Sequence, residues 1–450
     1  MGFNVGFGPQ TALPVMSPGL RRLTVRPLST TVSLMIKEAL RSILPDRTAF
    51  HLLATALGRA VQHGSLVVID PWGQRHVFGP DDTPTASIRV TDPRIPGRVL
   101  ADPMLGVGEA YMDGTLVLEQ GSLRDFLMMG VSIASDFAKS PQAARGFASP
   151  SRKPQRPNPV ERARANVAHH YDLSEELYRL FLDADLQYSC AYFQDGDESL
   201  ELAQAKKKRH IAAKLRLETG ARVLDIGSGW GGLALELASR HGVEVDGLTL
   251  SQEQFKVATA RVADGGLEPH VRFHLRDYRH ETGVYDRIVS VGMFEHVGPT
   301  HYGEFFNIVH RLLAPDGLAV IHAIGRTGPP SGCDPWIEKY IFPGGYCPAL
   351  SEVFTAIEPS GLRVTDVELL PLHYAETLRC WSERFRAHRA RAAEIYDERF
   401  CRMWEFYLAA CEAAFRGGNM TVFQIQLTRS IKASPPTRDY MIDEERRLLV

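Results

Sequence analysis

A glycine-rich segment in the middle of the chain has the residue types and spacing to hold a nucleotide-like ligand. The apolar run Arg222–Ile226 leads into the sequence GSGWGG at 227–232, and a helix-forming stretch follows at 233–238. Glycine lets a backbone approach a ligand closely and adopt positive φ. The spacing Gly227-x-Gly229-x-Gly231 differs from the Gly-x-Gly-x-x-Gly pattern of dinucleotide-binding folds. The segment therefore predicts a nucleotide-like ligand, with the identity of the nucleotide left open by the spacing alone.

Polar residues at the ends of the next two apolar runs extend this site. They are Thr249, Ser251, Gln254, Asp277 and Tyr278. The first three can reach a ribose and an amino-acid group, whereas Asp277 and Tyr278 can meet the edge and the face of an adenine. With an aspartate, Asp225, two residues before the first glycine, the glycine turn resembles motif I of class I methyltransferases, which bind S-adenosylmethionine.

Bringing these residues to one place requires a particular kind of sheet. From residue 167 onward, apolar runs alternate with amphipathic helical segments; the expected strands are Arg222–Ile226, Glu244–Leu250, Val271–Leu275, Arg287–Val291 and Leu318–Ile324. This alternation predicts an α/β fold with a doubly wound, mostly parallel sheet. Ligands of such sheets bind at the carboxyl ends of the strands.

The remainder of the chain divides by composition. Residues 1–34 lack acidic residues and are expected to form a flexible arm, with a targeting or membrane-surface role as the alternative. Residues 35–137 predict a small α+β domain, with a helix at 34–63 and a strand at Ser65–Asp70. Residues 138–166 form a basic linker rich in Pro, Ser and Arg. It is either a flexible tether or a segment attracted to anionic headgroups. Residues 167–432 form the catalytic domain, and 433–450 a C-terminal tail.

The overall composition narrows the class of protein. The chain has 450 residues and a net charge of −2, which gives no general attraction to nucleic acid. Its six cysteines contain no Cys-x-x-Cys pair, so we expect no metal site. The low cysteine content suits the cytoplasm. No apolar stretch approaches the ~20 residues needed to span a bilayer.

Several longer motifs resemble the cyclopropane-fatty-acyl-phospholipid synthases, a family that includes the mycolic acid cyclopropane synthases. They are His170–Ser174, Tyr188–Phe193, Val291–Gly298, Ile321–Gly325 and Lys339–Gly345. The resemblance runs from about residue 165 to about 430. The segments Asp92–Arg94 and Gly108–Met112 extend it to the N-terminal domain. It implies a seven-stranded class I methyltransferase sheet with a smaller α+β domain, the latter associated with lipid or membrane.

The resemblance also implies an activity. The alkene of an unsaturated phospholipid acyl chain would take the methyl group of S-adenosylmethionine, a bound bicarbonate ion would remove a proton, and a cyclopropane ring would close. The partners would be membrane phospholipids with unsaturated acyl chains. The enzyme would be cytoplasmic and peripheral at the inner face of the membrane. Homodimers are common in the family, and that state stays open here.

Residue roles follow from the same resemblance. Bicarbonate would be held by Cys190, Glu295, His322, the backbone at Ile324, and Tyr374. The cofactor would be bound by Tyr188, Ser189, Asp225, Gly227, Ser228, Gly229, Trp230, Gly231, Gly232, Thr249, Leu250, Ser251, Gln254, Asp277 and Tyr278. Aromatic rings can stabilise positive charge on the acyl chain, and the candidates are Tyr188, Tyr340, Phe342 and Trp381.

Three further features are explained by structure rather than by a role in the chemistry. A cysteine equivalent to Cys411 is marked as a possible nucleophile in the family, but here it lies on the apolar face of an expected helix and predicts core packing. Ser228 replaces a cysteine common in the family, with little expected consequence. The basic run Lys206–Arg209 is expected to be a solvated helix face, with a lipid-facing patch as the alternative.

Other functions stay open at this point. The enzyme could stop at a methyl- or methylene-branched lipid, because the fate of the carbocation depends on the exact placement of the base. It could be a binding protein that has lost catalysis. It could also methylate a small soluble molecule, which would leave the N-terminal domain and the linker without a purpose.

Overall fold

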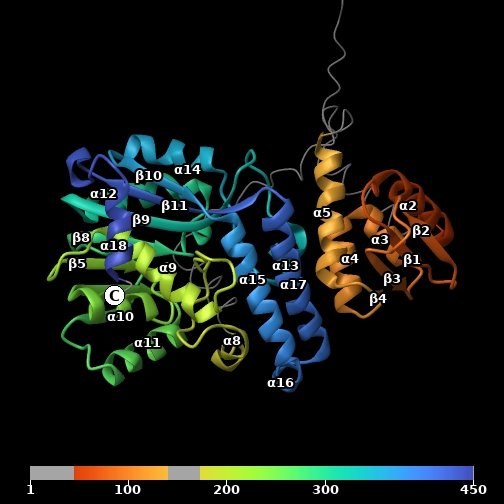
Figure 1. The fold of residues 1–450 in the computed structure, drawn as a ribbon, viewed down its shortest axis with the longest axis horizontal. Helices are drawn as coiled ribbons and strands as arrows, with labels where there is room; N and C mark the ends of the chain where they lie inside the picture. Colours follow the sequence, from red (N-terminus) through yellow and green to blue (C-terminus); the bar gives the residue numbers. More distant parts are fainter. Residues whose placement is uncertain (1–44, 140–172, 449–450) are drawn as a thin grey trace, which may run out of the picture.

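The computed structural model describes residues 45–139 and 173–448, which form a large α/β domain and a smaller N-terminal domain (Figure 1). The expectations for the arm at 1–34, for most of the basic linker and for the start of the His170–Ser174 motif lie outside the described residues.

The large domain is built on a seven-stranded sheet, as predicted. Its strands are β5 (Arg222–Ile226), β6 (Glu244–Thr249), β7 (Val271–Leu275), β8 (Tyr285–Val291), β9 (Leu313–Arg326), β10 (Arg363–Leu369) and β11 (Met420–Thr428). The strand order is β10-β11-β9-β8-β5-β6-β7. Strands β5 to β9 pair in parallel, and β11 runs antiparallel to both of its neighbours.

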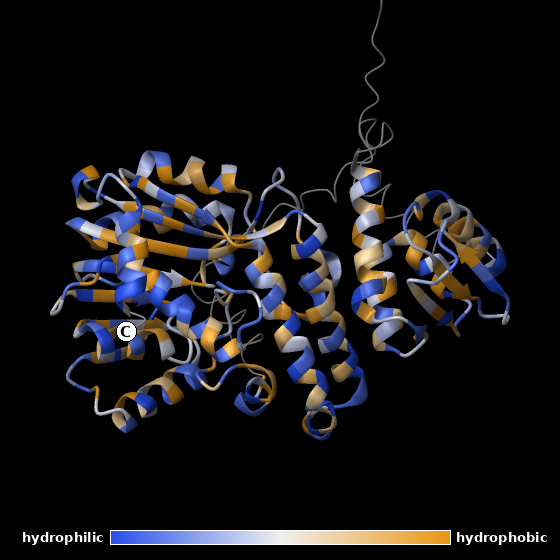
Figure 2. Cartoon of the chain, in the orientation of Figure 1, coloured by the Kyte–Doolittle hydropathy of each residue, from blue (hydrophilic) through white to orange (hydrophobic). Residues whose placement is uncertain are grey.

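Helices cover both faces of this sheet, which is what doubly wound means. One face holds α9 (Leu200–Leu215), α10 (Gly232–His241) and α11 (Gln252–Asp264), and the other holds α12 (Tyr302–Leu312) and α14 (Leu350–Ile357). Successive strand residues alternate between the two cores: Val223 packs with the first group, and Leu224 with the second. The strands are accordingly apolar along most of their length (Figure 2).

Strands are added to the sheet first on one side of β5 and then on the other, and this switch point determines where a ligand can bind. From β5 the chain proceeds outward through β6 to β7, and then returns to β8 on the other side of β5. The two connections leave the sheet in opposite directions at this switch point, which opens a crevice above the carboxyl ends of β5 and β8. The glycine turn at 227–232 follows β5 directly.

A second group of helices lies beside the sheet: α8 (Glu175–Phe181), α13 (Pro335–Tyr340), α15 (Pro371–Ala387), α16 (Arg389–Ile395) and α17 (Glu398–Gly417). They share a core rich in aromatic rings, which include Tyr178, Trp381, Trp404 and Tyr407. Short 3-10 helices lie at Tyr278–His280 (η1), Phe294–His296 (η2), Pro299–His301 (η3), Glu358–Ser360 (η4) and Ile431–Ala433 (η5).

The N-terminal domain has its own four-stranded sheet, in the order β2-β1-β3-β4. Its elements are α2 (Asp46–Ala60), β1 (Leu66–Ile69), β2 (Arg75–Phe78), β3 (Ala86–Val90), α3 (Ile95–Ala101), α4 (Pro103–Met112), β4 (Leu116–Gln120) and α5 (Leu123–Lys139). The strand predicted at Ser65–Asp70 is confirmed as β1. Among the described residues, no helix is long and apolar enough to cross a membrane.

The two domains meet along α4, α5, α13 and α17 (Figure 1). Glu109 on α4 accepts hydrogen bonds from Lys339 Nζ (2.7 Å) and from the Tyr340 hydroxyl (2.9 Å). Tyr340 therefore belongs to the domain contact. The Tyr340 hydroxyl thus helps to join the two domains, a role other than the predicted stabilisation of positive charge on the substrate.

The segment at 433–450 contains a helix, α18 (Asp439–Leu448), that packs against α9. The Tyr440 hydroxyl accepts a hydrogen bond from Gln426 Nε2 on β11 at 2.7 Å, and Glu445 pairs with His210 on α9. These contacts attach the end of the described chain to the large domain.

Candidate active site

A cavity lies at the switch point of the sheet, and most of the predicted cofactor residues line it. They are Tyr188, Ser189, Asp225, Gly227, Ser228, Gly229, Trp230, Thr249, Leu250, Gln254, Asp277 and Tyr278. Gly231, Gly232 and Ser251 are absent from the lining. Ser251 caps α11 by accepting from the Gln254 N–H, and a Cβ on Gly232 would collide with Asp185 and Gln187. The last two glycines therefore serve close packing.

Gly229 differs from the other glycines of the turn. Its φ is +54°, and a Cβ built there would have no protein atom within 4 Å. That free space is part of the cavity that Gly229 lines. The position combines a left-handed backbone with room for a ligand to approach the peptide plane.

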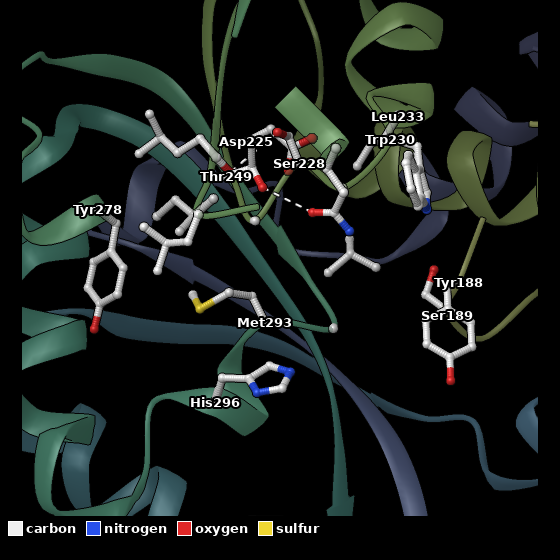
Figure 3. A pocket seen from close by; sticks show the side chains of 18 of the residues that line it. Tyr188, Ser189, Asp225, Ser228, Trp230, Leu233, Thr249, Tyr278, Met293 and His296 are labelled. Atoms are coloured by element: carbon white, nitrogen blue, oxygen red, sulfur yellow. Dashed lines mark hydrogen bonds between the residues drawn. The ribbon is translucent and has the colours of Figure 1, made fainter. Parts of the chain in front are cut away.

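Asp225 is a buried carboxyl at the cavity wall (Figure 3). Within the described part of the chain, its Oδ2 has no hydrogen-bond partner. Burial raises the pKa of Asp225 to about 7, and the positive charge of Lys207 opposes that rise. An unpartnered buried oxygen of this kind is costly, so it fits a ligand that brings a donor.

The opposite side of the cavity carries Asp277 and Tyr278. In Figure 3, Tyr278 lies on one side of the view and Tyr188 with Ser189 on the other. The Asp277 carboxylate is held by Arg279 at 2.8 Å. Thr249 Oγ1 donates to Gln254 Oε1 at 3.0 Å, which fixes the polar end of β6. Because β6 neighbours β7, Thr249 lies on the same side of the cavity as Asp277 and Tyr278, with Tyr188 and Ser189 opposite.

The predicted catalytic residues lie outside this cavity lining, and two of them are directly bonded. Glu295 on η2 accepts a hydrogen bond at Oε1 from the Ile324 N–H of β9 at 2.6 Å. Its Oε2 is buried and has no partner among the described residues. Burial raises the pKa of Glu295 to about 7. The Ile324 N–H is thus engaged in orienting Glu295.

His322 precedes Ile324 by two residues, so both side chains lie on the same face of β9. Gln424 Nε2 on the adjacent β11 lies 3.1 Å from His322 Nδ1. Burial, together with the charge of Lys207, lowers the pKa of His322 to about 3, so the ring is neutral. With Gln424 donating to Nδ1, the ring proton resides on Nε2, and His322 is a donor there.

Cys190 and Tyr374 are both buried, and Cys190 acts electrostatically on Tyr374. The Cys190 thiol contacts the carbonyl of Ala191 at 3.2 Å. Burial raises the pKa of Cys190 and of Tyr374, and the nearby groups that add to the rise at Tyr374 include Cys411, Cys190 and Glu295. Of the predicted bicarbonate ligands, Cys190 and Glu295 therefore lie within electrostatic reach of the Tyr374 hydroxyl.

Tyr188 connects the cavity to these groups. Its ring lines the cavity and stacks on Trp381, with ring centroids 5.1 Å apart. Trp381 in turn meets Tyr374 edge to face at 5.9 Å. The Tyr188 hydroxyl shares a hydrogen bond of 2.8 Å with Tyr407. Of the other aromatic candidates, Phe342 packs against Tyr407.

The prediction for the basic run at 206–209 is wrong at two positions. Lys207 is only 1% exposed and Lys208 only 7%. Lys208 Nζ pairs with Asp185 at 2.7 Å, and Lys207 Nζ donates to Gln187 and Ser189. These partners come from the segment 183–189, which covers that face of α9, so the two lysines are neither a solvated face nor a lipid-facing patch.

Several residues of the cavity wall are not among the predicted site residues. They include Leu186, Gln187, Met293, His296 and His301. Met293 and His296 follow β8 within the motif Val291–Gly298, so their position after a parallel strand could have indicated them. Gln187 stands in a stretch without periodicity, and the sequence carries no comparable signal for it.

A mostly parallel sheet of this order has a glycine turn at its switch point and, beside it, a buried carboxyl oxygen with no partner among the described residues. Together these features define a class I S-adenosylmethionine-dependent methyltransferase. The sequence model of the family described as mycolic acid cyclopropane synthetase matches residues 159–425. The chain is 40% identical over 353 residues to the cyclopropane-fatty-acyl-phospholipid synthase of Escherichia coli K12, covering 77% of this chain and 89% of that protein.

Two further relatives agree. A probable fatty acid methyltransferase of Pseudomonas putida is 36% identical over 78% of this chain and 89% of its own length. The solved structure of mycolic acid cyclopropane synthase CmaA1, complexed with SAH and CTAB, is 36% identical with a TM-score of 0.56, covering 59% of this chain and 97% of that one. The chain belongs to the mycolic acid cyclopropane synthetase family.

The open space at Gly229 yields a prediction with a matched control. Gly229→Ala should weaken binding of S-adenosylhomocysteine by at least about tenfold, because the methyl group fills the approach space and strains a positive φ. Gly266→Ala imposes the same kind of strain, at φ +63° with no atom within 4 Å, but away from the cavity. Calorimetry should show a similar loss of thermal stability in both variants, and lost affinity in the first alone. Equal affinities would contradict a ligand at Gly229.

Cys411 yields a second prediction. Burial raises the pKa of its thiol to about 12, so almost none of it is thiolate at neutral pH, and a thiol is a weak nucleophile. Cys411→Ser should therefore retain turnover within a few-fold of the wild type in a methyl-transfer assay. Complete loss of turnover in a folded variant would restore a chemical role for this cysteine.

Proposed function

We propose that the chain is a cyclopropane-fatty-acyl-phospholipid synthase that uses S-adenosylmethionine and a bound bicarbonate ion. The methyl carbon bonds to one carbon of a cis alkene while the carbon–sulfur bond breaks and sulfur keeps its electron pair. One proton then leaves the new methyl group, and its carbon bonds to the second alkene carbon. The observation that carries the proposal is the buried Glu295 oxygen, which has no partner among the described residues and lies within electrostatic reach of Tyr374.

The residues present fit a small oxyanion with one hydrogen. Glu295 Oε2 can accept its O–H, because Oε1 is already occupied by the Ile324 N–H. His322 Nε2–H and the Tyr374 hydroxyl can donate to its other oxygens. Bicarbonate held there would supply the base for the proton that leaves the methyl group. The neutral His322 and the protonated Cys190 add no competing negative charge.

The surroundings exclude water from the reacting carbons. Cys190, His322 and Trp381 are each at most 2% exposed. A carbocation that met water would end as an alcohol, so a dry site protects the ring-forming path. The faces of Tyr188 and Trp381 can stabilise positive charge on the chain. Tyr188 is placed for this, because it lies between the cavity and Tyr374.

Membrane phospholipids are the proposed substrate, which the enzyme would reach as a cytoplasmic peripheral protein at the inner face of the membrane. The support is the Escherichia coli relative, a cyclopropane-fatty-acyl-phospholipid synthase whose match covers 77% of this chain and so extends beyond the catalytic domain. An acyl chain must leave the bilayer to meet a buried alkene site, and the cavity offers it apolar wall residues such as Leu186, Tyr188 and Met293.

A labelled methyl group tests the reaction. With S-adenosylmethionine carrying a CD3 group and cis-unsaturated phosphatidylglycerol vesicles, the product should gain one CD2 unit and lose its alkene signal. Mass spectrometry and NMR of the acyl chain measure both. An acyl chain that keeps the full CD3 group, or that gains CD2 but retains an alkene, would mean a branched lipid and would overturn ring closure.

Glu295 provides a prediction about the base site. Glu295→Gln keeps the size of the side chain and an oxygen for the Ile324 N–H, but it replaces the acceptor Oε2 with a donor. Turnover should fall by at least about 100-fold, whereas affinity for S-adenosylhomocysteine should stay close to that of the wild type. Single-turnover assays at several bicarbonate concentrations and calorimetry check the two quantities.

The control is Glu352→Gln on α14. Glu352 also accepts a backbone N–H, from Ala349 at 3.0 Å, but it is not one of the predicted catalytic residues. It should lose stability without losing turnover per folded molecule. If Glu295→Gln were as active as this control, Glu295 would have no part in holding the base.

A further inference from the structure

Lys207 is a buried cation that the proposed reaction leaves unused. Its Nζ donates to Gln187 Oε1 at 2.6 Å and to Ser189 Oγ at 2.8 Å, and both of these residues line the cavity. Within the described residues, Lys207 forms no ion pair with a carboxylate. A buried ammonium with neutral contacts is expensive unless another charge compensates it. Asp183 and Asp185 compensate part of this charge without contacting the ammonium. The position of Lys207 behind the cavity wall allows an anionic group of the ligand to compensate it further.

The contact with Lys207 determines what Ser189 offers to the cavity. An ammonium has only donors, so Ser189 Oγ must accept from it, and the serine's own hydrogen remains for a different acceptor. Gln187 is oriented at both ends of its carboxamide, because its nitrogen donates to Asp185 at 3.0 Å while its oxygen accepts from Lys207. Gln204 Nε2 also holds the carbonyls of Gln187 and Ser189, at 3.2 and 2.9 Å. Ser189 is therefore a fixed hydroxyl donor.

Asp225 provides the opposite sign of charge along the same cavity. Its unpartnered Oδ2 can accept from an ammonium group, and Ser189, backed by Lys207, can donate to a carboxylate. The two groups are complementary to the two ends of a zwitterionic amino acid. Tyr278 lies on the opposite side of the view from Ser189 in Figure 3. The end of the cavity beside Tyr278 is therefore available for the adenosyl group.

We infer that Lys207 is a positioning residue that makes Ser189 the donor to the α-carboxylate of the bound cofactor and that stabilises this carboxylate by its charge. The inference rests on the cofactor assigned in the proposed function, but it is independent of the lipid product. It predicts that the enzyme distinguishes cofactor analogues by their carboxylate, and that this distinction depends on Lys207.

The test measures affinities for two ligands by calorimetry: S-adenosylhomocysteine, and its decarboxylated analogue S-adenosyl-3-thiopropylamine, which keeps the amine. In Lys207→Met, affinity for the first should fall by about tenfold to 100-fold, and affinity for the second should change much less. Ser189→Ala should show the same selective loss. The double variant should lose less than the two single losses combined, because both residues serve one contact.

The control is Lys214→Met, which removes another buried lysine of α9. Lys214 Nζ pairs with Glu368 at 2.5 Å rather than with a cavity residue. It should be less stable than the wild type but should keep the preference for the carboxylate. Equal loss of both ligands in Lys207→Met, or no loss of either, would overturn the inference and indicate a structural cation. If wild type bound neither ligand, the cofactor assignment itself would be wrong.

A measurement without mutation covers the case in which Lys207→Met does not fold. Burial lowers the pKa of Lys207 to about 8; Asp183, Asp185 and Cys190 oppose this, and Lys208 adds to it. Since only the charged form attracts a carboxylate, affinity of the wild type for S-adenosylhomocysteine should decline as pH rises through that value. The decline should exceed that of the decarboxylated analogue. Parallel profiles for the two ligands would contradict the role of Lys207.

Discussion

The hydrogen bond from the Ile324 N–H to Glu295 Oε1 is the interaction on which the geometry of the catalytic groups depends. It ties η2, which follows β8, to the end of β9, and so holds a carboxyl at the edge of the sheet where the glycine turn also lies. Only one oxygen of Glu295 is satisfied in this way. Burial raises the pKa of the group to about 7, and the backbone bond opposes the rise by favouring the charged form.

Strands β9 and β11 contain several buried polar side chains in this region of the sheet. His322 on β9 faces Gln424 on β11, and Gln426 on β11 donates to the carbonyl of Lys214 at 2.5 Å. A strand of apolar residues would be more stable at these places. The polar pair instead selects one tautomer of His322, because a neutral ring with Nδ1 occupied must carry its proton on Nε2. The sheet thus sets the hydrogen-bonding pattern of the site as well as its position.

The sequence predicts those parts of the structure that depend on local pattern. Strands β5 to β9 are apolar runs separated by helical segments. The glycines at 227, 229 and 231 predict a turn with positive φ, which the structure has. Strand β11 is harder to recognise, because Thr421, Gln424 and Gln426 interrupt it, although all are buried. The burial of Lys207 cannot be read from its helix, since charged runs are usually solvated. It follows from oxygens in the segment 183–189, which only the tertiary fold brings to α9.

The side chains around the proposed base site are mostly uncharged, which suits a reaction with a cationic intermediate. Burial holds His322 neutral, keeps the Cys190 thiol protonated and raises the pKa of Tyr374, so these groups around the proposed base site are uncharged. Lys207 is the nearby cation: it contacts Ser189 and Gln187, and its charge also reaches His322 and Cys190. A positive charge close to the alkene would oppose the developing carbocation, because Coulomb repulsion is strong where water is absent. Placed behind Ser189, the same charge can act on an anionic end of the cofactor. Tyr188 and Trp381, whose faces attract cations, then stand between the cavity and Tyr374.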